Sequence, residues 1–146
     1  MTNISALLSN AISGLNTNTV LTVQDVLVPG SRLRGKKADL QRRAGQYVNT
    51  LFGFLGEEYG RCLSIYQWQK LLHKHNLTIL EQETTQKRVD FDQWIAPAAL
   101  NKNGRVRLRA MLIQAPQPVL EFLTPQITGD RIQFHITELT IIGEKT

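Results

Sequence analysis

The residues best suited to chemistry are three histidines and one cysteine, and their spacing does not combine them into a site. His73 and His75 stand two apart in a predicted helix, so their side chains point to different faces and cannot bind one metal ion together. They fall in its last turn, where the helix dipole favours positive charge. His135 lies between two apolar residues of a predicted strand and is expected to face the other side of the sheet. Cys62 stands at a predicted helix start, which can lower a thiol pKa, but we favour a buried and unreactive thiol.

The glycine-rich turns that bind nucleotides are not found in this sequence. Its ten glycines never form a G-x-G pattern, and it contains no P-loop. Gly30 and Gly35 are five apart, and Gly53 and Gly56 are three apart. No serine stands in the setting of a nucleophile elbow. The sequence therefore predicts no self-contained nucleotide site and no serine-hydrolase site.

A short basic stretch is the clearest charge pattern. Its basic residues, opposed only by Asp39, are Arg32, Arg34, Lys36, Lys37, Arg42 and Arg43. The net charge of +5 and the pI of about 9.7 favour an anionic partner. On the predicted helix, however, Arg42 lies opposite the apolar stripe while Arg43 flanks it, and no aromatic residue is interleaved as a stacking platform. We therefore favour a solvated surface or a mouth that attracts an acidic small molecule, and keep nucleic-acid binding as a weaker alternative.

Length and composition are those of one globular domain. The chain has 146 residues, of which 42% are hydrophobic, enough to build a core. No apolar run approaches the roughly 20 residues that span a bilayer, so no membrane partner is expected. Met1 to Asn10 lack the basic and apolar segments of a secretory signal, and a single cysteine makes no internal disulfide. We therefore expect a cytoplasmic protein.

Hydrophobic periodicity predicts three strands and about five helices. We expect strands at residues 20–28, 77–89 and 131–142, and helices at residues 3–13, 36–52, 64–76, 105–113 and 118–123. A capping box begins the third helix at Ser64, and Trp68 lies on its apolar stripe. In the last strand the apolar alternation of residues 132–136 resumes out of phase at Leu139, which predicts a bulge or an end of pairing near Glu138. Three strands are few for an α/β domain, so we expect the sheet to be part of something larger.

Several segments follow one another in the order and spacing of a known family. They are Val20-Leu21-Thr22-Val23-Gln24-Asp25-Val26-Leu27-Val28-Pro29-Gly30, Arg34-Gly35-Lys36-Lys37-Ala38, Gly45-Gln46-Tyr47-Val48-Asn49, the helix from Cys62 to Leu72, Phe91-Asp92-Gln93-Trp94, and the strand from Ile132 to Lys145. Together they resemble the fifth strand, lid helix, next helix, F-D-x-W turn and last strand of a bacterial small-molecule branch of the class I S-adenosylmethionine-dependent methyltransferases. The resemblance covers residues 20–145, most of the chain.

The resemblance implies an α/β fold built on a partial Rossmann-like methyltransferase sheet. Strands five, seven and six are expected with flanking helices, the last strand lying antiparallel in the middle. Residues 1–146 are then a single domain, the C-terminal half of that fold. In it residues 1–30 form a helix and the fifth strand, residues 31–62 the lid helix region, and residues 63–146 the C-terminal helices and strands.

The resemblance also implies methyl transfer from S-adenosylmethionine to a small-molecule acceptor. In such a reaction the enzyme chiefly aligns the methyl donor with the acceptor. This half is expected to supply the acceptor pocket and the lid, with Asp25, Tyr47 and Asn49 lining the pocket and Arg34 meeting an acidic substrate. For Tyr47, packing in the core is the stronger alternative.

The sequence departs from the family in two places. The family's glycine-rich turn and ribose-binding acid have no match, so the chain alone is expected to be incomplete and not to bind S-adenosylmethionine tightly. Related sequences commonly hold an Asp-Pro-Ser-His run before the cysteine. Here Gly56-Glu57-Glu58-Tyr59-Gly60 stands in its place, so any role of that histidine is lost or altered.

A second class of function stays open beside the enzyme. The chain is then a non-catalytic remnant, or an interaction module that pairs with another chain. Val20–Val28 has no lysine, no internal proline and only one charge, Asp25, so a free edge on this strand invites pairing. We expect either a homodimer through that edge or a separate N-terminal half docked on it.

Overall fold

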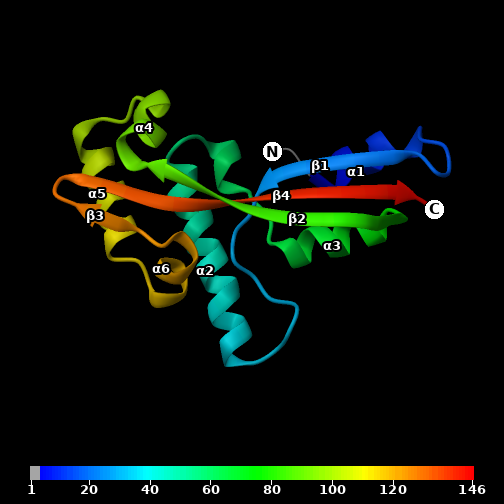
Figure 1. Ribbon diagram of the computed structural model, residues 1–146, viewed down its shortest axis with the longest axis horizontal. Coiled ribbons are helices and arrows are strands. Elements are labelled where there is room, and N and C mark those ends of the chain that lie inside the picture. Colours follow the sequence, from blue (N-terminus) through cyan, green and yellow to red (C-terminus); the bar gives the residue numbers. More distant parts are fainter. Residues whose placement is uncertain (1–3) are drawn as a thin grey trace.

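The computed structural model describes residues 4–146; Asn3, with which the first predicted helix begins, lies outside them. In chain order the elements are α1 (Ile4–Ser13), β1 (Val20–Val26), α2 (Lys36–Gly53), η1 (Glu57–Gly60), α3 (Ile65–Lys74), β2 (Leu77–Asp90), α4 (Phe91–Ile95), η2 (Ala96–Ala98), α5 (Lys102–Ile113), α6 (Gln117–Leu123), β3 (Gln126–Thr128) and β4 (Arg131–Lys145). Among these residues no helix combines the length and apolar character needed to cross a membrane. Figure 1 shows β4 running the width of the molecule, with the helices gathered around it.

The sheet has the order β1-β4-β2, and its middle strand is antiparallel to both neighbours. β1 and β2 therefore run parallel to each other. This arrangement confirms the predicted fold class, a mixed α/β sheet with flanking helices and an antiparallel last strand in the middle. The short strand β3 pairs with the start of β4 and forms a hairpin that the sequence pattern did not predict.

Of the two alternatives predicted near Glu138, the bulge is wrong, whereas an end of pairing is confirmed for the neighbour β1. β4 pairs with β2 without a break over residues 133–142, and the register shift lies in β2, where Leu80 is the extra residue between Ile79 and Glu81. Pairing with β1 does begin at Glu138. The buried apolar residues of β4 change from even-numbered to odd-numbered positions because its two halves bury opposite faces of the sheet. A regular strand without a bulge therefore accounts for the whole pattern.

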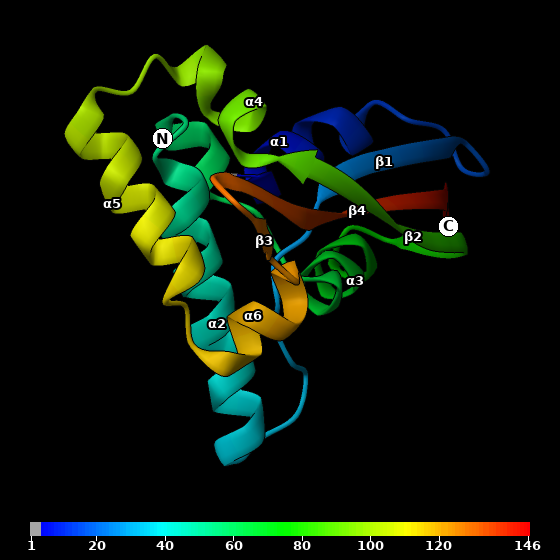
Figure 2. The ribbon, with the colours of Figure 1, turned by 60° about the vertical axis from the view of Figure 1, so that its left-hand side comes forward.

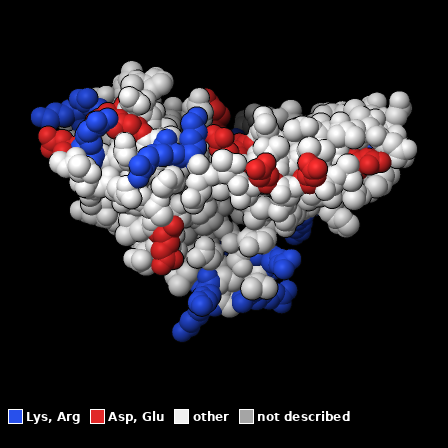
Figure 3. All heavy atoms as spheres, in the orientation of Figure 1, with Lys and Arg blue, Asp and Glu red and all other residues white. Residues whose placement is uncertain are grey.

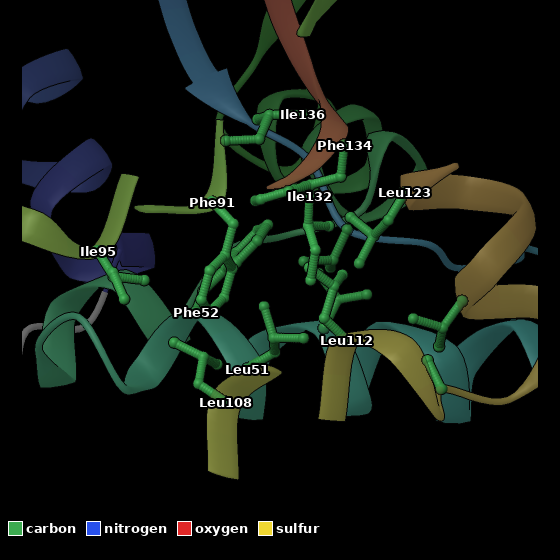
Figure 4. Close-up of a cluster of buried hydrophobic side chains, with 14 of the residues drawn as sticks. Leu51, Phe52, Phe91, Ile95, Leu108, Leu112, Leu123, Ile132, Phe134 and Ile136 are labelled. Carbon is green, nitrogen blue, oxygen red and sulfur yellow. The ribbon is translucent and has the colours of Figure 1, made fainter. Parts of the chain in front are cut away.

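The first core lies on one face of the sheet, over the first half of β4. Figure 4 shows Ile132, Phe134 and Ile136 pointing toward side chains of α2, α5 and α6. Trp94 of α4 closes this core edge-on, with its ring centroid 5.7 Å from Phe52 and 5.1 Å from Phe134. In Figure 2, α2, α5 and α6 stand together on this side of the sheet.

The second core lies on the opposite face, over the other end of β4, and it is built from α1 and α3. Its buried side chains are Ile12, Leu27, Trp68, Leu72, Leu77, Leu139 and Ile141. α3 begins with the predicted capping box, because the Ser64 hydroxyl accepts from the Gln67 N–H while the Gln67 amide accepts from the Ser64 N–H. Asn76 ends the helix in the left-handed conformation, at φ 62°, as expected.

Trp68 tests the second core, since only 5% of its surface is exposed and its indole N–H has no hydrogen-bond partner among the described residues. We expect Trp68→Ala to lower the free energy of unfolding by about 3–5 kcal/mol in denaturant melts, as large-to-small core changes do. Trp68→Phe should cost clearly less, because it keeps a ring and removes the unpaired N–H. Tyr66→Ala, on the exposed side of α3, should stay within about 0.5 kcal/mol. A loss below about 1 kcal/mol for Trp68→Ala contradicts this packing.

Candidate functional site

A cavity of about 200 Å³ lies where the chain leaves the carboxyl end of β1. Its walls are the segment that follows β1, one face of α2 and the start of α3. The lining residues are Val28, Pro29, Gly30, Ser31, Arg42, Gly45, Gln46, Asn49, Cys62, Ser64 and Gln67. Ligands of α/β folds bind outside the carboxyl ends of the strands, so this cavity is the candidate site.

Two glycines let the three walls of the cavity meet. A Cβ atom placed on Gly45 lies 2.2 Å from the carbonyl O of Pro29, so α2 can press against the segment after β1 only at a glycine. A Cβ atom on Gly30 lies 2.5 Å from Cβ of Ser64, at the start of α3. The cavity is therefore held in shape by close backbone packing.

Asn49 joins α2 to the segment before α3. Its Nδ2 donates to the carbonyl O of Cys62 at 3.0 Å, and its Oδ1 accepts from the Cys62 N–H at 2.9 Å. The side chain thus satisfies both backbone groups of one residue in a stretch without regular structure. Asn49 lines this cavity, and its amide is already engaged in holding the cavity wall.

The predicted site residue Asp25 lies at the end of β1, outside the cavity. It lines an open hollow with Gln24, Val26 and Glu138, and its carboxylate accepts from the Val26 N–H at 2.8 Å. Burial raises the pKa of Asp25, and the hydrogen bond from Val26 opposes that shift. Asp25 and Asn49 therefore do not share a pocket, although both influence Cys62.

Cys62 is half-buried and has an electrically unfavourable setting for a thiolate. Burial and, to a smaller extent, the negative charge of Asp25 together raise the pKa of its thiol to about 11. The thiol therefore stays protonated at neutral pH, which agrees with the unreactive cysteine favoured from the sequence.

Tyr47 and Arg34 are not brought to the cavity. The Tyr47 hydroxyl donates to the carbonyl O of Met111 in α5 at 2.7 Å, and the ring packs on the first core. Burial raises the pKa of Tyr47. This placement matches the core-packing alternative for Tyr47. Arg34 is exposed in the segment between β1 and α2.

Arg42 is the charged residue in the cavity lining, and the sequence did not point to it as a site residue. Its guanidinium donates to the carbonyl O of Ser31 at 3.2 Å and of Leu33 at 2.8 Å, and it pairs with Asp39 at 2.6 Å. Helical spacing could have predicted that Arg42 lies beside Asn49. The two residues are seven apart, on the face of the helix opposite the apolar stripe.

The described residues form no candidate metal-binding site. Among residues 4–146, no group of three or more His, Cys, Asp or Glu residues is placed to hold an ion. His135 and Thr124 contact each other through Nδ1 and the hydroxyl, 2.5 Å apart. The cavity thus offers amides, one guanidinium, two serine hydroxyls, the protonated Cys62 thiol and backbone groups. It can orient a polar ligand, and it supplies no activated nucleophile.

The pH dependence of Cys62 alkylation reports the pKa of the thiol, and therefore its burial and the effect of the neighbouring negative charge. We expect its alkylation by iodoacetamide to rise with a midpoint near pH 11, because only about one thiol in a thousand is ionised at pH 8. Asp25→Asn should lower that midpoint by removing a neighbouring negative charge, whereas Asp130→Asn, in the turn before β4, should leave it unchanged. A midpoint near 8.5, the ordinary value for cysteine, contradicts the burial of the thiol.

Comparison with known proteins relates the chain to solved structures only. No protein-family model and no curated protein matches the sequence. The structure superposes with a TM-score of 0.78 on a crystal structure from Bacillus halodurans that carries a provisional assignment as a methyltransferase, at 15% identity and over 97% of this chain. It superposes with a TM-score of 0.84 on the YcgJ protein of Bacillus subtilis, at 14% identity and over 99% of this chain. The chain spans 62% and 58% of the lengths of these two proteins, so the similarity establishes a methyltransferase-like fold over part of their length.

Proposed function

We propose that this chain is the acceptor-binding part of an S-adenosylmethionine-dependent methyltransferase that acts on a small molecule. The observation that carries the proposal is the sheet order β1-β4-β2 with its antiparallel middle strand, which superposes on the Bacillus halodurans protein over 97% of the chain. In this proposal β1, β4 and β2 are the fifth, seventh and sixth strands. The cavity beside β1 takes the acceptor, and α2 with the segment before it forms the lid.

The cofactor is assigned to a part of the enzyme outside these residues. Residues 4–146 contain no G-x-G turn between a strand and a helix, and the cavity has no acidic side chain in its lining. The methyl donor is therefore proposed to come from a glycine-rich half, on the same polypeptide or on another. The role of this chain is then to orient the acceptor against the donor, which is the main task in methyl transfer.

An anionic acceptor suits the basic stretch that connects two cavity-lining residues, Ser31 and Arg42. Figure 3 shows lysine and arginine side chains around the lower end of α2, at the start of that helix. The basic residues there include Arg34, Lys36 and Lys37, all of them exposed. Clustered charge of one sign attracts an oppositely charged small molecule over several ångströms, although salt weakens the effect.

A non-catalytic interaction module is the second candidate function. Tyr47 and Asn49, two of the residues that the resemblance places at the acceptor pocket, are both bonded within the chain. The Cys62 thiol is also protonated. These internal contacts stabilise the fold and require no substrate. The two candidate functions therefore differ in the ligand: a small-molecule acceptor for the enzyme, and another polypeptide chain for the interaction module.

Titration with small carboxylates tests the acceptor class. We expect amide shifts at Ser31, Gln46 and Asn49 in ¹⁵N–¹H spectra, larger for acids than for the corresponding primary amides. Replacing Arg34 and Lys36 together by glutamine should weaken acid binding by about 3-fold to 10-fold, the size of two exposed charge contacts.

Arg107→Gln is the matched control for this titration. Arg107 is equally basic but lies on α5, over the ring of Phe54 at 6.0 Å, so its loss should not change binding. Equal affinity for acids and amides contradicts an anionic acceptor, and shifts that map only to other surfaces contradict the assignment of the cavity.

Calorimetry with S-adenosylmethionine tests the division of labour. The chain alone should bind it with a Kd weaker than about 1 mM, because the cavity lining has no acidic side chain for its ribose and the sequence has no glycine-rich G-x-G turn. A Kd in the low micromolar range or below contradicts the proposal that the cofactor half lies elsewhere.

A further inference from the structure

The hydrogen bonds that hold the cavity wall together leave its polar side chains with unused donors, and these donors indicate what the cavity binds. We propose that Arg42, with the hydroxyls of Ser31 and Ser64, binds the carboxylate of a small acid inside the cavity, and that this carboxylate replaces Asp39 as the partner of Arg42. The inference rests on the proposed function, because it takes the acceptor to be the molecule that occupies the cavity. It assigns the recognition of charge to a lining residue rather than to the exposed basic residues at the start of α2.

The two serine hydroxyls of the lining accept hydrogen bonds from the backbone and keep their own protons unused. The Ser64 Oγ accepts from the Gln67 N–H at 3.2 Å. The Ser31 Oγ accepts from the Leu33 N–H at 3.0 Å. Ser64 is only 3% exposed, so its proton is a buried donor that meets no acceptor within residues 4–146. Because buried polar groups find hydrogen-bond partners, we expect a ligand to place an acceptor atom there.

The amide side chains of the lining follow the same pattern. The Gln67 Oε1 accepts from the Ser64 N–H at 2.8 Å, whereas its Nε2 donates to no described residue. The Asn49 Oδ1 accepts from the Cys62 N–H, and its Nδ2 uses one proton on the carbonyl O of Cys62 and keeps the other. The exposed amide of Gln46 bonds to no described residue at either end. In most of these side chains the acceptor is engaged and a donor remains, so the cavity suits a ligand that is rich in acceptors.

Arg42 gives the cavity a positive charge that no carboxylate or histidine in the described lining opposes. A guanidinium has five N–H donors. The Nη1 of Arg42 donates to the carbonyl O atoms of Ser31 and Leu33, and one Nη2 proton is used on Asp39. The Nε proton and the second Nη2 proton therefore remain. They lie on the planar group that matches the two oxygens of a carboxylate.

The ion pair between Arg42 and Asp39 is weak enough to be exchanged. The two side chains stand three residues apart on α2 and are 41% and 60% exposed. Exposed ion pairs of this kind contribute little to stability, because water screens them. A carboxylate inside the cavity meets the same guanidinium with less water around it and lies beside the buried Ser64 hydroxyl. The exchange conserves charge, since one carboxylate leaves the guanidinium as another arrives.

The size and charge of the cavity limit the ligand to a small monocarboxylic acid. At about 200 Å³ the cavity is smaller than the pockets of roughly 300–1,000 Å³ that enclose drug-sized molecules. Inorganic phosphate is the competing ligand. A phosphate group carries more than one negative charge at neutral pH, and the described lining holds a single cation, Arg42. We therefore commit to a carboxylate as the bound group.

Titrations of the full chain with butyrate, butyramide and inorganic phosphate test the proposal, with the ¹⁵N–¹H signals of the cavity as the readout. We expect butyrate to shift the amide signals of Ser31 and Ser64. It should bind at least about 10-fold more tightly than butyramide, the size of a hydrogen-bonded charge contact. Phosphate should bind more weakly than butyrate. Equal affinity for butyrate and butyramide, or tighter binding of phosphate, overturns the proposal.

Arg42→Gln should reduce the preference for butyrate over butyramide to about 2-fold or less, while the affinity for butyramide stays the same. This ratio separates binding from structure, because a collapsed wall lowers the affinity for both probes together. Arg43→Gln, at the neighbouring exposed residue outside the lining, removes the same charge and should leave the ratio unchanged. A preference that survives in Arg42→Gln overturns the proposal.

Asp39→Asn gives the opposite change and keeps the wall contacts of Arg42. It frees the guanidinium from its present partner, so butyrate should bind about 2-fold to 5-fold more tightly while butyramide binds as before. Asp130→Asn, which removes an exposed carboxylate in the turn before β4, should change neither affinity. This gain of affinity decides the matter even if Arg42→Gln loosens the cavity wall. Unchanged binding of butyrate in Asp39→Asn overturns the proposal.

The outcomes also separate this inference from the proposed function. An acid preference that survives in Arg42→Gln but is lost when Arg34 and Lys36 are replaced leaves the anionic acceptor standing and rejects Arg42 as its binding group. Binding of butyrate that depends on Arg42, together with micromolar binding of S-adenosylmethionine to the chain alone, supports the inference and contradicts the proposed division of labour. Signals that shift only outside the cavity overturn both.

Discussion

The structure depends on one strand, β4, which pairs with three other strands and contributes buried side chains to both hydrophobic cores. β4 pairs with β1, β2 and β3, and its 15 residues bury Ile132, Phe134 and Ile136 on one face and Leu139 and Ile141 on the other. A slip of one residue reverses both faces together, so the register of the whole sheet is held by two opposed hydrophobic patterns. The helices are distributed accordingly, α2, α5 and α6 against the first pattern and α1 and α3 against the second.

The candidate site is a consequence of how β1 leaves that sheet. Leu27 makes the last bond to β4, and the next N–H, of Val28, donates to the carbonyl O of Leu63 at 3.2 Å instead. The chain is thereby drawn between α2 and the start of α3, where Gly45 and Gly30 permit the contact. The polar residues of α2 then face a small cavity, because its apolar stripe is committed to the first core. Packing and site formation are two results of the same helix placement.

Basic and acidic side chains are separated on the surface of the molecule. Basic residues gather around the start of α2, and acidic residues lie along the exposed part of β4 and β2 (Figure 3). Neither group has much influence on the fold, since the ion pairs formed by described residues are at least partly exposed. Exposed charges of this kind act mainly on what approaches the molecule rather than on its stability.

Local interactions explain what the sequence alone determined. The capping box of Ser64 and Gln67, the left-handed Asn76 and the apolar stripe of α3 are all short-range, and each was recoverable from spacing. The family resemblance supplied the strand order, which periodicity could not. Only the tertiary structure decided which face each half of β4 buries, so a change of face was misinterpreted as a bulge. It also decided that Tyr47 turns to Met111 and that Asn49 and Arg42 hold the cavity wall. These choices depend on partners distant in sequence, and no local pattern encodes which partner a side chain will meet.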